Sequence, residues 1–139
     1  MNVPPHIHAA WNAALDVRAN AHCPYSNYRV GAALLAVGHP TLFVGCNVEN
    51  ASYGATLCAE RNAICAAVTA LGTFTLRDLV LVTEQTAPPC GMCLQVIIEF
   101  ADTNTRIYLA TPEKITHKLA LADLLPHQFD PSHLYSSHD

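Results

Sequence analysis

Apolar residues recur along the chain at two spacings, one typical of helices and one typical of buried strands. In the helical stretches they return every three or four positions, as at Ile7, Trp11, Ala14 and Leu15. In the strand-like stretches they form continuous runs bounded by turn residues. Helices are predicted from Pro5 to about residue 21 and over residues 58–71 and 91–101. Strands are predicted over residues 28–37, 41–48, 76–83 and 106–110.

The order of these elements favours a mixed sheet covered by helices. A Gly-His-Pro segment at residues 38–40 separates the first two strands and predicts a hairpin. The second strand, the helix that follows it and the third strand form a natural crossover unit, which is normally right-handed. Residues 115–125 are ambiguous between strand and helix. The pattern therefore predicts an α/β fold.

The composition describes one folded, slightly acidic domain. The 139 residues are 51% hydrophobic and 13% charged, which excludes a disordered, charge-rich chain and suits a single domain over residues 1–139. The net charge of −4 argues against a protein that grips nucleic-acid polymers, because such partners usually need a basic face. The polar segment 129–139 is expected to be a partly mobile tail.

The sequence offers no sign of export or membrane insertion. No stretch near its start resembles a signal peptide. The longest apolar run, around residues 30–37, is shorter than the roughly 18 residues that a membrane-spanning helix needs. We therefore expect a cytoplasmic protein without a membrane partner, whose six cysteines stay reduced. In that compartment clustered cysteines more often bind metal or take part in chemistry than form disulfides.

Three cysteines stand where predicted helices begin. Cys58 opens the second predicted helix, and Cys90 and Cys93 lie at the start of the third. The partial positive charge of a helix N-terminus favours the thiolate, which is the form that binds zinc. No fourth ligand appears at the expected spacing, and three ligands plus water is the pattern of a catalytic zinc site. Glu60, two residues after Cys58, stands where a general acid and base is needed.

The two cysteine motifs are more specific together than either is alone. For an isolated Cys-x-x-Cys pair, a structural zinc site or cysteines that only pack are together about as expected as a catalytic site. Cys-Ala-Glu at 58–60 followed by Pro-Cys-x-x-Cys at 89–93 is the signature of zinc deaminases, in which three cysteines are an allowed ligand set. Arg61 would offset the negative charge of three thiolates, unless it is simply a solvated helix arginine. We expect one catalytic zinc per chain.

A polar pair precedes the second predicted helix. If strand geometry continues to Glu49, the side chains of Asn47 and Glu49 share one face of the strand. An amide and a carboxylate side by side bind a hydroxyl group as donor and acceptor. A polar strand end followed by a turn is the simpler alternative.

Four segments resemble those of the small homo-oligomeric cytidine deaminases, in that family's order and spacing. They are CPYSNYRVGAALL (23–35), GCNVENASYGATLCAERNAI (45–64), PCGMCLQ (89–95) and LLPHQF (124–129). The resemblance covers nearly the whole chain. It implies the cytidine deaminase fold, an α/β/α sandwich around a five-stranded mixed sheet with helices on both faces. It also implies that part of residues 115–121 forms an edge strand.

The resemblance further implies roles for the matching side chains. The three cysteines of the two motifs would hold zinc, and Glu60 would shuttle protons. Asn47 and Glu49 would bind the ribose 3′-hydroxyl, and Tyr28 would stack on the base, where the family usually has phenylalanine. Two aromatic residues match family positions that reach active sites across subunit contacts, namely Tyr53 and Phe129. A homotetramer is therefore implied.

The sequence departs from the family pattern at three positions. Leu94 stands where the family has an arginine, which removes a positive charge near the zinc. We therefore hypothesise that the zinc water ionises less readily than in relatives with both arginines. Tyr28 adds a hydroxyl group at the base pocket, which allows an altered base preference. Asn62 replaces the usual threonine, and we assign no meaning to that change.

These expectations combine into one function. We expect a zinc-dependent hydrolase of pyrimidine salvage that deaminates cytidine and deoxycytidine to uridine and deoxyuridine with release of ammonia. Two alternatives stay open: the same chemistry on another amino-bearing ring, such as a modified cytidine or a nucleoside antibiotic, and a non-catalytic zinc- or nucleoside-binding protein. Editing of polynucleotides is disfavoured by the net charge and by Glu49, whose carboxylate would repel a 3′-phosphate.

Overall fold

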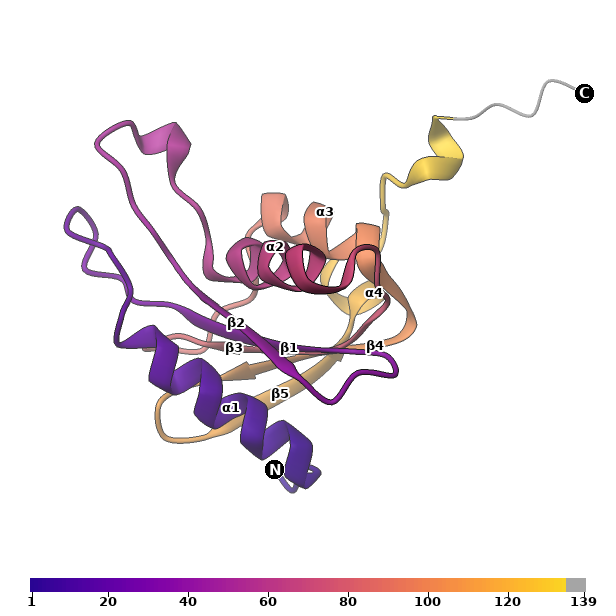
Figure 1. Cartoon of the computed structure of the whole chain (residues 1–139), viewed down its shortest axis with the longest axis horizontal. Helices are drawn as coiled ribbons and strands as arrows, with labels where there is room; N and C mark the ends of the chain where they lie inside the picture. Colours follow the sequence, from indigo (N-terminus) through magenta and orange to yellow (C-terminus); the bar gives the residue numbers. More distant parts are fainter. Residues whose placement is uncertain (135–139) are drawn as a thin grey trace, which may run out of the picture.

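The computed structural model describes residues 1–134, which form a five-stranded sheet between two layers of helices (Figure 1). The helices are α1 (Pro5–Arg18), α2 (Ala59–Leu71), α3 (Gly91–Phe100) and the short α4 (Leu121–Leu124). The strands are β1 (Gly31–Ala36), β2 (Leu42–Cys46), β3 (Leu76–Val82), β4 (Ala101–Ala110) and β5 (Ile115–Ala120). Two 3₁₀ turns are present, at Tyr53–Ala55 and Pro131–His133.

The sheet is mixed, with the strand order β2-β1-β3-β4-β5. β1 pairs antiparallel with both β2 and β3, and β5 pairs antiparallel with β4. β3 and β4 are parallel and are joined through α3, because a parallel pair needs a crossover connection. β2 and β3 run in the same direction on either side of β1, with α2 between them in the chain. The predicted hairpin, crossover connection and edge strand are therefore confirmed.

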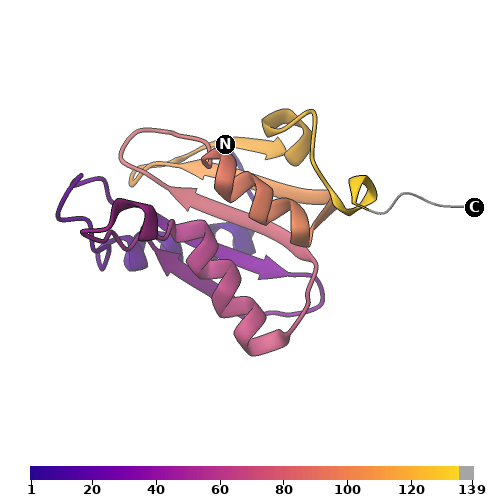
Figure 2. The ribbon, with the colours of Figure 1, turned by 90° about the horizontal axis from the view of Figure 1, so that it is seen from above.

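The helices cover both faces of the sheet. α1 lies on one face, and α2 and α3 lie on the other (Figures 1 and 2). Alternate residues of β3 enter different cores: Leu79 and Leu81 pack on the α2 and α3 side, and Val80 and Val82 pack on the α1 side. Burial on both faces explains why this strand appears in the sequence as a continuous apolar run. The predicted α/β/α sandwich is confirmed.

Two glycines let helices lie close against the sheet. A Cβ atom on Gly31 of β1 would collide with the carbonyl oxygen of Ala14 in α1. A Cβ atom on Gly45 of β2 would collide with the carbonyl oxygen of Ala59 and would lie 2.5 Å from the amide nitrogen of Ala63. The start of α2 is therefore fixed against the end of β2.

The first helix and strand are shorter than predicted. α1 ends at Arg18 instead of near residue 21, and the carbonyl groups of Ala19 and Ala21 accept hydrogen bonds from the Arg29 side chain instead of continuing the helix. β1 begins at Gly31 instead of residue 28. The apolar pattern did not reveal these ends because side-chain hydrogen bonds set them.

The last strands are longer and better defined than predicted. β4 begins at Ala101 instead of residue 106, because its polar first half is joined to β3 through the buried Thr105, whose hydroxyl donates to the Leu76 carbonyl oxygen at 2.6 Å. The ambiguous region forms β5 followed by α4. Within the expected tail, Asp130 caps the second 3₁₀ turn, and residues 135–139 lie outside the described part of the chain.

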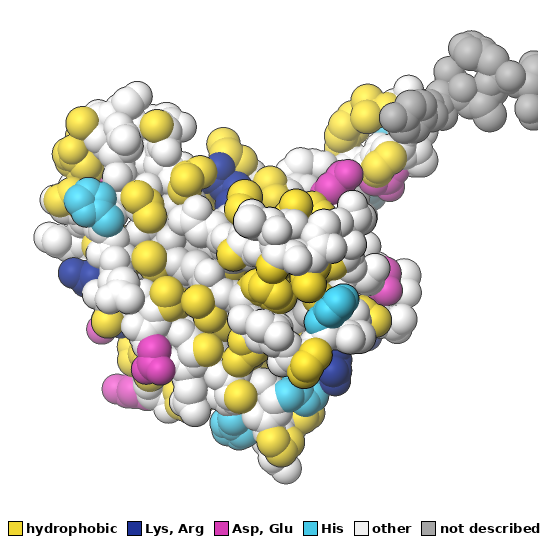
Figure 3. Space-filling model, in the orientation of Figure 1, with side chains coloured by type: hydrophobic (Ala, Val, Ile, Leu, Met, Phe, Trp, Pro, Cys, Tyr) yellow, Lys and Arg dark blue, Asp and Glu magenta, His cyan; other side chains and the backbone are white. Residues whose placement is uncertain are grey.

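Loops at residues 24–29 and 49–57 form a raised lobe beside α2 (Figures 1 and 3). Hydrophobic side chains are exposed on this lobe, among them Tyr25, Tyr53 and Leu57. None of the helices within residues 1–134 has the length and apolar character needed to cross a membrane.

Candidate active site

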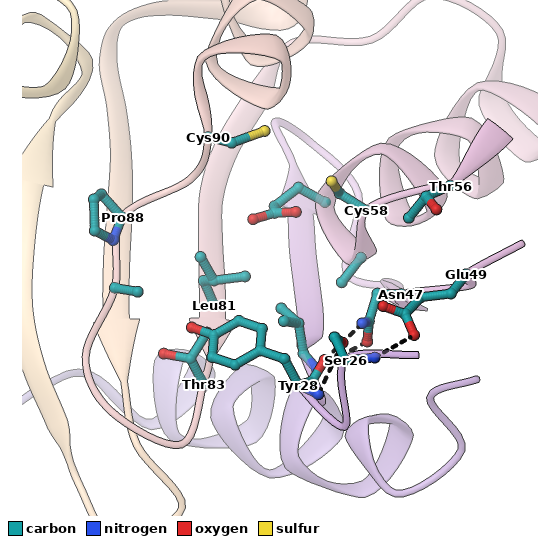
Figure 4. A pocket seen from close by; sticks show the side chains of 14 residues that line it. Ser26, Tyr28, Asn47, Glu49, Thr56, Cys58, Leu81, Thr83, Pro88 and Cys90 are labelled. Carbon is teal, nitrogen blue, oxygen red and sulfur yellow. Dashed lines mark hydrogen bonds between the residues drawn. The ribbon is translucent and has the colours of Figure 1, made fainter. Parts of the chain in front are cut away.

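The three cysteines of the predicted metal site come together at the N-termini of α2 and α3. Cys58 immediately precedes α2 and Cys90 immediately precedes α3, both with extended backbone, and Cys93 lies in the first turn of α3. The two helices lie on the same face of the sheet (Figure 2). The three sulfur atoms therefore lie within 4.8 Å of one another. The Cys58 and Cys90 side chains point into the same space from different helices (Figure 4).

Contacts within the cluster favour a thiolate at Cys58. The pKa of Cys58 is lowered to about 5, because the Cys93 thiol hydrogen-bonds to it and the Arg61 guanidinium stabilises its negative charge. The same hydrogen bond, together with burial, raises the pKa of Cys93. Arg61 Nη2 lies 3.4 Å from Cys58 Sγ and donates to the Thr56 carbonyl oxygen at 3.2 Å. The cluster thus carries negative charge at neutral pH with a cation beside it.

The cluster fits a zinc ion in chemistry and in dimensions. Thiolates bind zinc at about 2.3 Å in tetrahedral sites, which places their sulfurs about 3.8 Å apart. The three sulfurs are close enough to reach that spacing with small side-chain movements. Arg61 Nε is buried without a hydrogen-bond partner among the described residues, so the guanidinium keeps a donor for further thiolate charge. Three cysteines leave one coordination position for water, as in catalytic zinc sites.

Glu60 is the buried acid of this site. It is the second residue of α2 and is only 4% exposed. The Cys93 thiol donates to Glu60 Oε2 at 3.4 Å. Burial raises the pKa of the Glu60 carboxyl group. The group can therefore take up and release a proton nearer to neutral pH than an exposed glutamate can.

A cavity of about 430 Å³ lies beside the cysteines and Glu60. This volume is typical of sites that bind small molecules. Six residues singled out in the sequence line it: Tyr28, Asn47, Glu49, Cys58, Glu60 and Cys90 (Figure 4). The fold thus brings the polar pair and the predicted metal site to one cavity.

The side chain of Asn47 holds the backbone on either side of Arg29. Its Nδ2 donates to the Tyr28 carbonyl oxygen at 2.7 Å, and its Oδ1 accepts from the Val30 amide at 2.9 Å. Asn47 is 8% exposed. β2 ends at Cys46, so Asn47 is oriented by these side-chain bonds and not by a continued strand.

Glu49 is fixed by the turn that precedes Tyr28. Its Oε1 accepts hydrogen bonds from the backbone amides of Tyr25 and Ser26 at 3.0 and 3.1 Å. A hydrogen bond from the Ser26 side chain is the main cause that lowers the pKa of Glu49. A carboxylate is therefore present at this wall of the cavity at neutral pH.

Tyr53, Phe129 and Leu94, which the sequence analysis also singled out, lie away from this cavity. Tyr53 is 74% exposed and borders a neighbouring cavity. Phe129 is 54% exposed, and its carbonyl oxygen accepts a hydrogen bond from Gln95 Nε2 at 2.8 Å. Leu94 is buried in the core under α3. Arg61 is thus the cation beside the cysteines in the described part of the chain.

Three residues that shape the site had no role in the sequence analysis. Ser26 and Thr83 line the cavity, and Ser26 Oγ accepts from the Tyr28 amide at 3.0 Å. Asn62 Nδ2 donates to the Cys46 carbonyl oxygen at 2.7 Å and so ties α2 to the end of β2. Thr83 ends a predicted strand and Asn62 departs from the family pattern, and these were the only signals that the sequence offered for the three residues.

Comparison with known proteins identifies relatives over most of the chain. Residues 5–110 match the family model of the cytidine and deoxycytidylate deaminase zinc-binding region. The chain is 38% identical over 121 residues to a cytidine deaminase of Halalkalibacterium halodurans, covering 84% of this chain and 88% of that protein. It is 41% identical over 118 residues to a cytidine deaminase of Sporosarcina psychrophila, covering 84% and 86%.

Solved structures show the same fold. The cytidine deaminase of Burkholderia pseudomallei matches with a TM-score of 0.79 at 40% identity, covering 88% of this chain and 98% of that one. The cytidine deaminase of Mycobacterium tuberculosis matches with a TM-score of 0.78 at 35% identity, covering 93% and 99%. Sequence, fold and the cluster of three cysteines agree, and the chain therefore belongs to the cytidine and deoxycytidylate deaminase family.

Proposed function

We propose that this protein is a zinc-dependent hydrolase that converts cytidine and deoxycytidine to uridine and deoxyuridine with release of ammonia. The observation that carries the proposal is the buried Glu60 carboxyl group beside three clustered sulfurs, at a cavity of small-molecule size. Membership of the family and the cytidine deaminases among the relatives support the same reaction.

The metal and the Glu60 carboxyl group have different tasks in the reaction. Cys58, Cys90 and Cys93 would hold zinc, which would activate a water at neutral pH. Glu60 takes a proton from this water and delivers it to ring nitrogen N3, which makes C4 more electrophilic. After the water oxygen has added to C4, Glu60 moves the second proton of that water to the amino group, the bond from C4 to this nitrogen breaks, and ammonia leaves as the C4 carbonyl forms. Cytidine and water thus become uridine and ammonia.

The other lining residues favour a free nucleoside. Tyr28 offers an aromatic face for the base, and Asn47 and Glu49 offer donor and acceptor groups to the ribose 3′-hydroxyl. A 3′-phosphate would lie against the Glu49 carboxylate, whose lowered pKa keeps it ionised. Nucleotides within a strand are therefore disfavoured, and the net charge of −4 acts in the same direction.

A cytoplasmic role in pyrimidine salvage and a homotetrameric assembly belong to this proposal. The rings of Tyr53 and Phe129, which match family positions that reach active sites across subunit contacts, are both exposed and so are available for such contacts. Light scattering on the eluting protein tests the assembly. Particles of one chain at micromolar concentration would contradict it.

Deamination of another amino-bearing ring is the second candidate. The observation that favours it is Tyr28, whose hydroxyl group adds a polar atom to the cavity. An N4-substituted cytidine that is turned over faster than cytidine would establish this candidate.

The experiment that tests the proposal measures ammonia release by the zinc-loaded protein. Cytidine, deoxycytidine, free cytosine, N4-substituted cytidines and adenosine are compared, using wild type, Glu60→Gln and the exposed control Glu99→Gln. We expect turnover of cytidine and deoxycytidine, a loss of about 10²-fold or more in Glu60→Gln, and no change in the control. If neither nucleoside is turned over while about one zinc is bound per chain, the proposal is wrong.

A further inference from the structure

Two chain segments form the walls of the cavity around Tyr28. One wall is the segment 26–30, and the other is the segment 83–88 that connects β3 to α3. Figure 4 shows the Tyr28 ring extending toward Thr83 of the second wall. A second cavity of about 360 Å³ is lined by Tyr28 together with residues 84–87. Tyr28 and Ala87 line both cavities, so they form the partition between them.

Arg18, the last residue of α1, is bonded to both walls. Its Nε donates to the Arg29 carbonyl oxygen at 3.0 Å, next to Tyr28 in the chain. Its Nη2 donates to Glu84 Oε2 at 2.6 Å. The Arg18 side chain is 15% exposed, and the Glu84 side chain is 72% exposed. A largely buried guanidinium thus joins one wall to a carboxylate on the surface of the other.

The other side-chain contacts of the two walls hold each of them separately. The first wall is bonded to Asn47 and Glu49. The second wall is bonded to the sheet, where the Thr83 amide donates to the Ala110 carbonyl oxygen and the Thr86 hydroxyl contacts the Thr116 hydroxyl at 3.0 Å. The pairing of β1 with β3 at Gly31 and Val82 sets the spacing where the two walls begin, and beyond that point Arg18 is bonded to both walls.

We propose that Arg18 and Glu84 are positioning residues that set the separation of the two walls and so restrict the substituents that the base can carry. The inference rests on the proposed function, because it places a cytosine ring against Tyr28. With the ion pair intact, the partition is closed and an unsubstituted cytosine ring fits between the walls. When the pair is broken, the partition opens toward the second cavity, cytidine is held less tightly and a larger ring is admitted.

The test compares steady-state kinetics with cytidine and with 5-methylcytidine, using the zinc-loaded full-length protein. Glu84→Ala breaks the pair at an exposed position where the fold is not at risk. Glu84→Gln keeps an acceptor oxygen and is the conservative variant, and Glu99→Ala is the control for loss of an exposed carboxylate. Arg18→Lys keeps the charge but cannot donate two hydrogen bonds in the same fork geometry.

For Glu84→Ala we expect the KM for cytidine to rise about three- to fivefold, with kcat within about twofold of wild type. Fivefold corresponds to about 1 kcal/mol, the upper end for an ion pair with one exposed partner. A change in KM alone is expected because the walls bind the ring equally in ground and transition states. The ratio of kcat/KM for 5-methylcytidine to that for cytidine should rise about threefold or more.

The other variants make the test specific for the ion pair. Arg18→Lys should behave as Glu84→Ala, the double variant should add little to either single change, and Glu84→Gln should recover part of the loss.

The results distinguish failure of the positioning role from failure of the proposed function. If wild type turns over cytidine but Glu84→Ala matches Glu99→Ala in KM and in the substrate ratio, the positioning role is wrong. A lower melting temperature without a change in that ratio also overturns it, because the pair would then only stabilise the chain. If wild type turns over neither nucleoside, the proposed function fails and the positioning role fails with it.

Discussion

Asn47 offers a test of whether a residue expected to bind substrate also maintains the architecture of the site. Its amide group is bonded at both ends to backbone, to the Tyr28 carbonyl oxygen at 2.7 Å and from the Val30 amide at 2.9 Å. Asn47→Ala removes both partners at once. The backbone that carries Tyr28 would then lose two of its bonds to the end of β2, while the bond from the residue 47 amide to the Val30 carbonyl oxygen at 3.3 Å would stay.

The expected cost follows from the two groups that are left without a partner. The Val30 amide is buried, and an unsatisfied buried group costs about 1–3 kcal/mol. The Tyr28 carbonyl group is nearer to solvent, so its loss should cost about 1 kcal/mol. We therefore expect Asn47→Ala to lower the free energy of unfolding by about 2–4 kcal/mol. Asn47→Asp keeps the acceptor for Val30 and should lose about half of that.

Urea unfolding at fixed zinc concentration measures the effect, because bound metal adds to apparent stability. The midpoint should shift without a change in slope. Asn50→Ala is the matched control, since Asn50 is exposed and its side chain accepts only a local hydrogen bond from Ser52. If Asn47→Ala unfolds within about 0.5 kcal/mol of wild type while the KM for cytidine rises, Asn47 acts on the substrate alone and our reasoning is wrong.

Three further outcomes are expected. Gly45→Ala should lower the free energy of unfolding by about 1–3 kcal/mol and reduce bound zinc, because the new methyl group meets Ala59 at the start of α2; equal zinc content and stability would contradict this. Arg61→Gln should weaken zinc binding about 10–100-fold in chelator competition, since the guanidinium lowers the pKa of Cys58, whereas an unchanged zinc affinity would exclude that role. Burial raises the pKa of Asp78 in the folded protein. Ionisation of this carboxyl group therefore lowers the free energy of unfolding as the pH rises from about 4, the ordinary pKa of an aspartate, through the raised pKa. In urea titrations, the free energy of unfolding of Asp78→Asn should therefore rise relative to that of wild type across this pH range. A difference between the two proteins that does not change with pH would contradict the raised pKa of Asp78.

The metal site could be predicted because its information is local in the chain. Each cysteine motif lies at the start of a helix whose apolar spacing is visible in the sequence, so helix N-termini and ligands were found together. The apolar run of β3 gave the central strand for the same reason. Leu94, which the sequence analysis considered only for the charge that it removes near the zinc, is buried in the core under α3.

Other features depend on contacts between distant segments, and the sequence pattern does not contain them. Arg18 and Glu84 are 66 positions apart, so their pairing requires the folded sheet. The start of β1 at Gly31, later than predicted, depends on side-chain bonds from Asn47 to the segment 28–30. The first half of β4 is polar because it lies near the edge of the sheet, and only the buried Thr105 marks it.

The place of β3 between β1 and β4 has a consequence for synthesis of the protein on the ribosome. β3 gains its parallel neighbour only when the chain has been made as far as Ala110. The last of the three cysteines, Cys93, is made 17 residues earlier, which is about 1–3 s at ordinary rates of translation. During that interval all three thiols exist, but the sheet that supports α3 is incomplete. A stable metal site is therefore expected late in synthesis, although its ligands are made early.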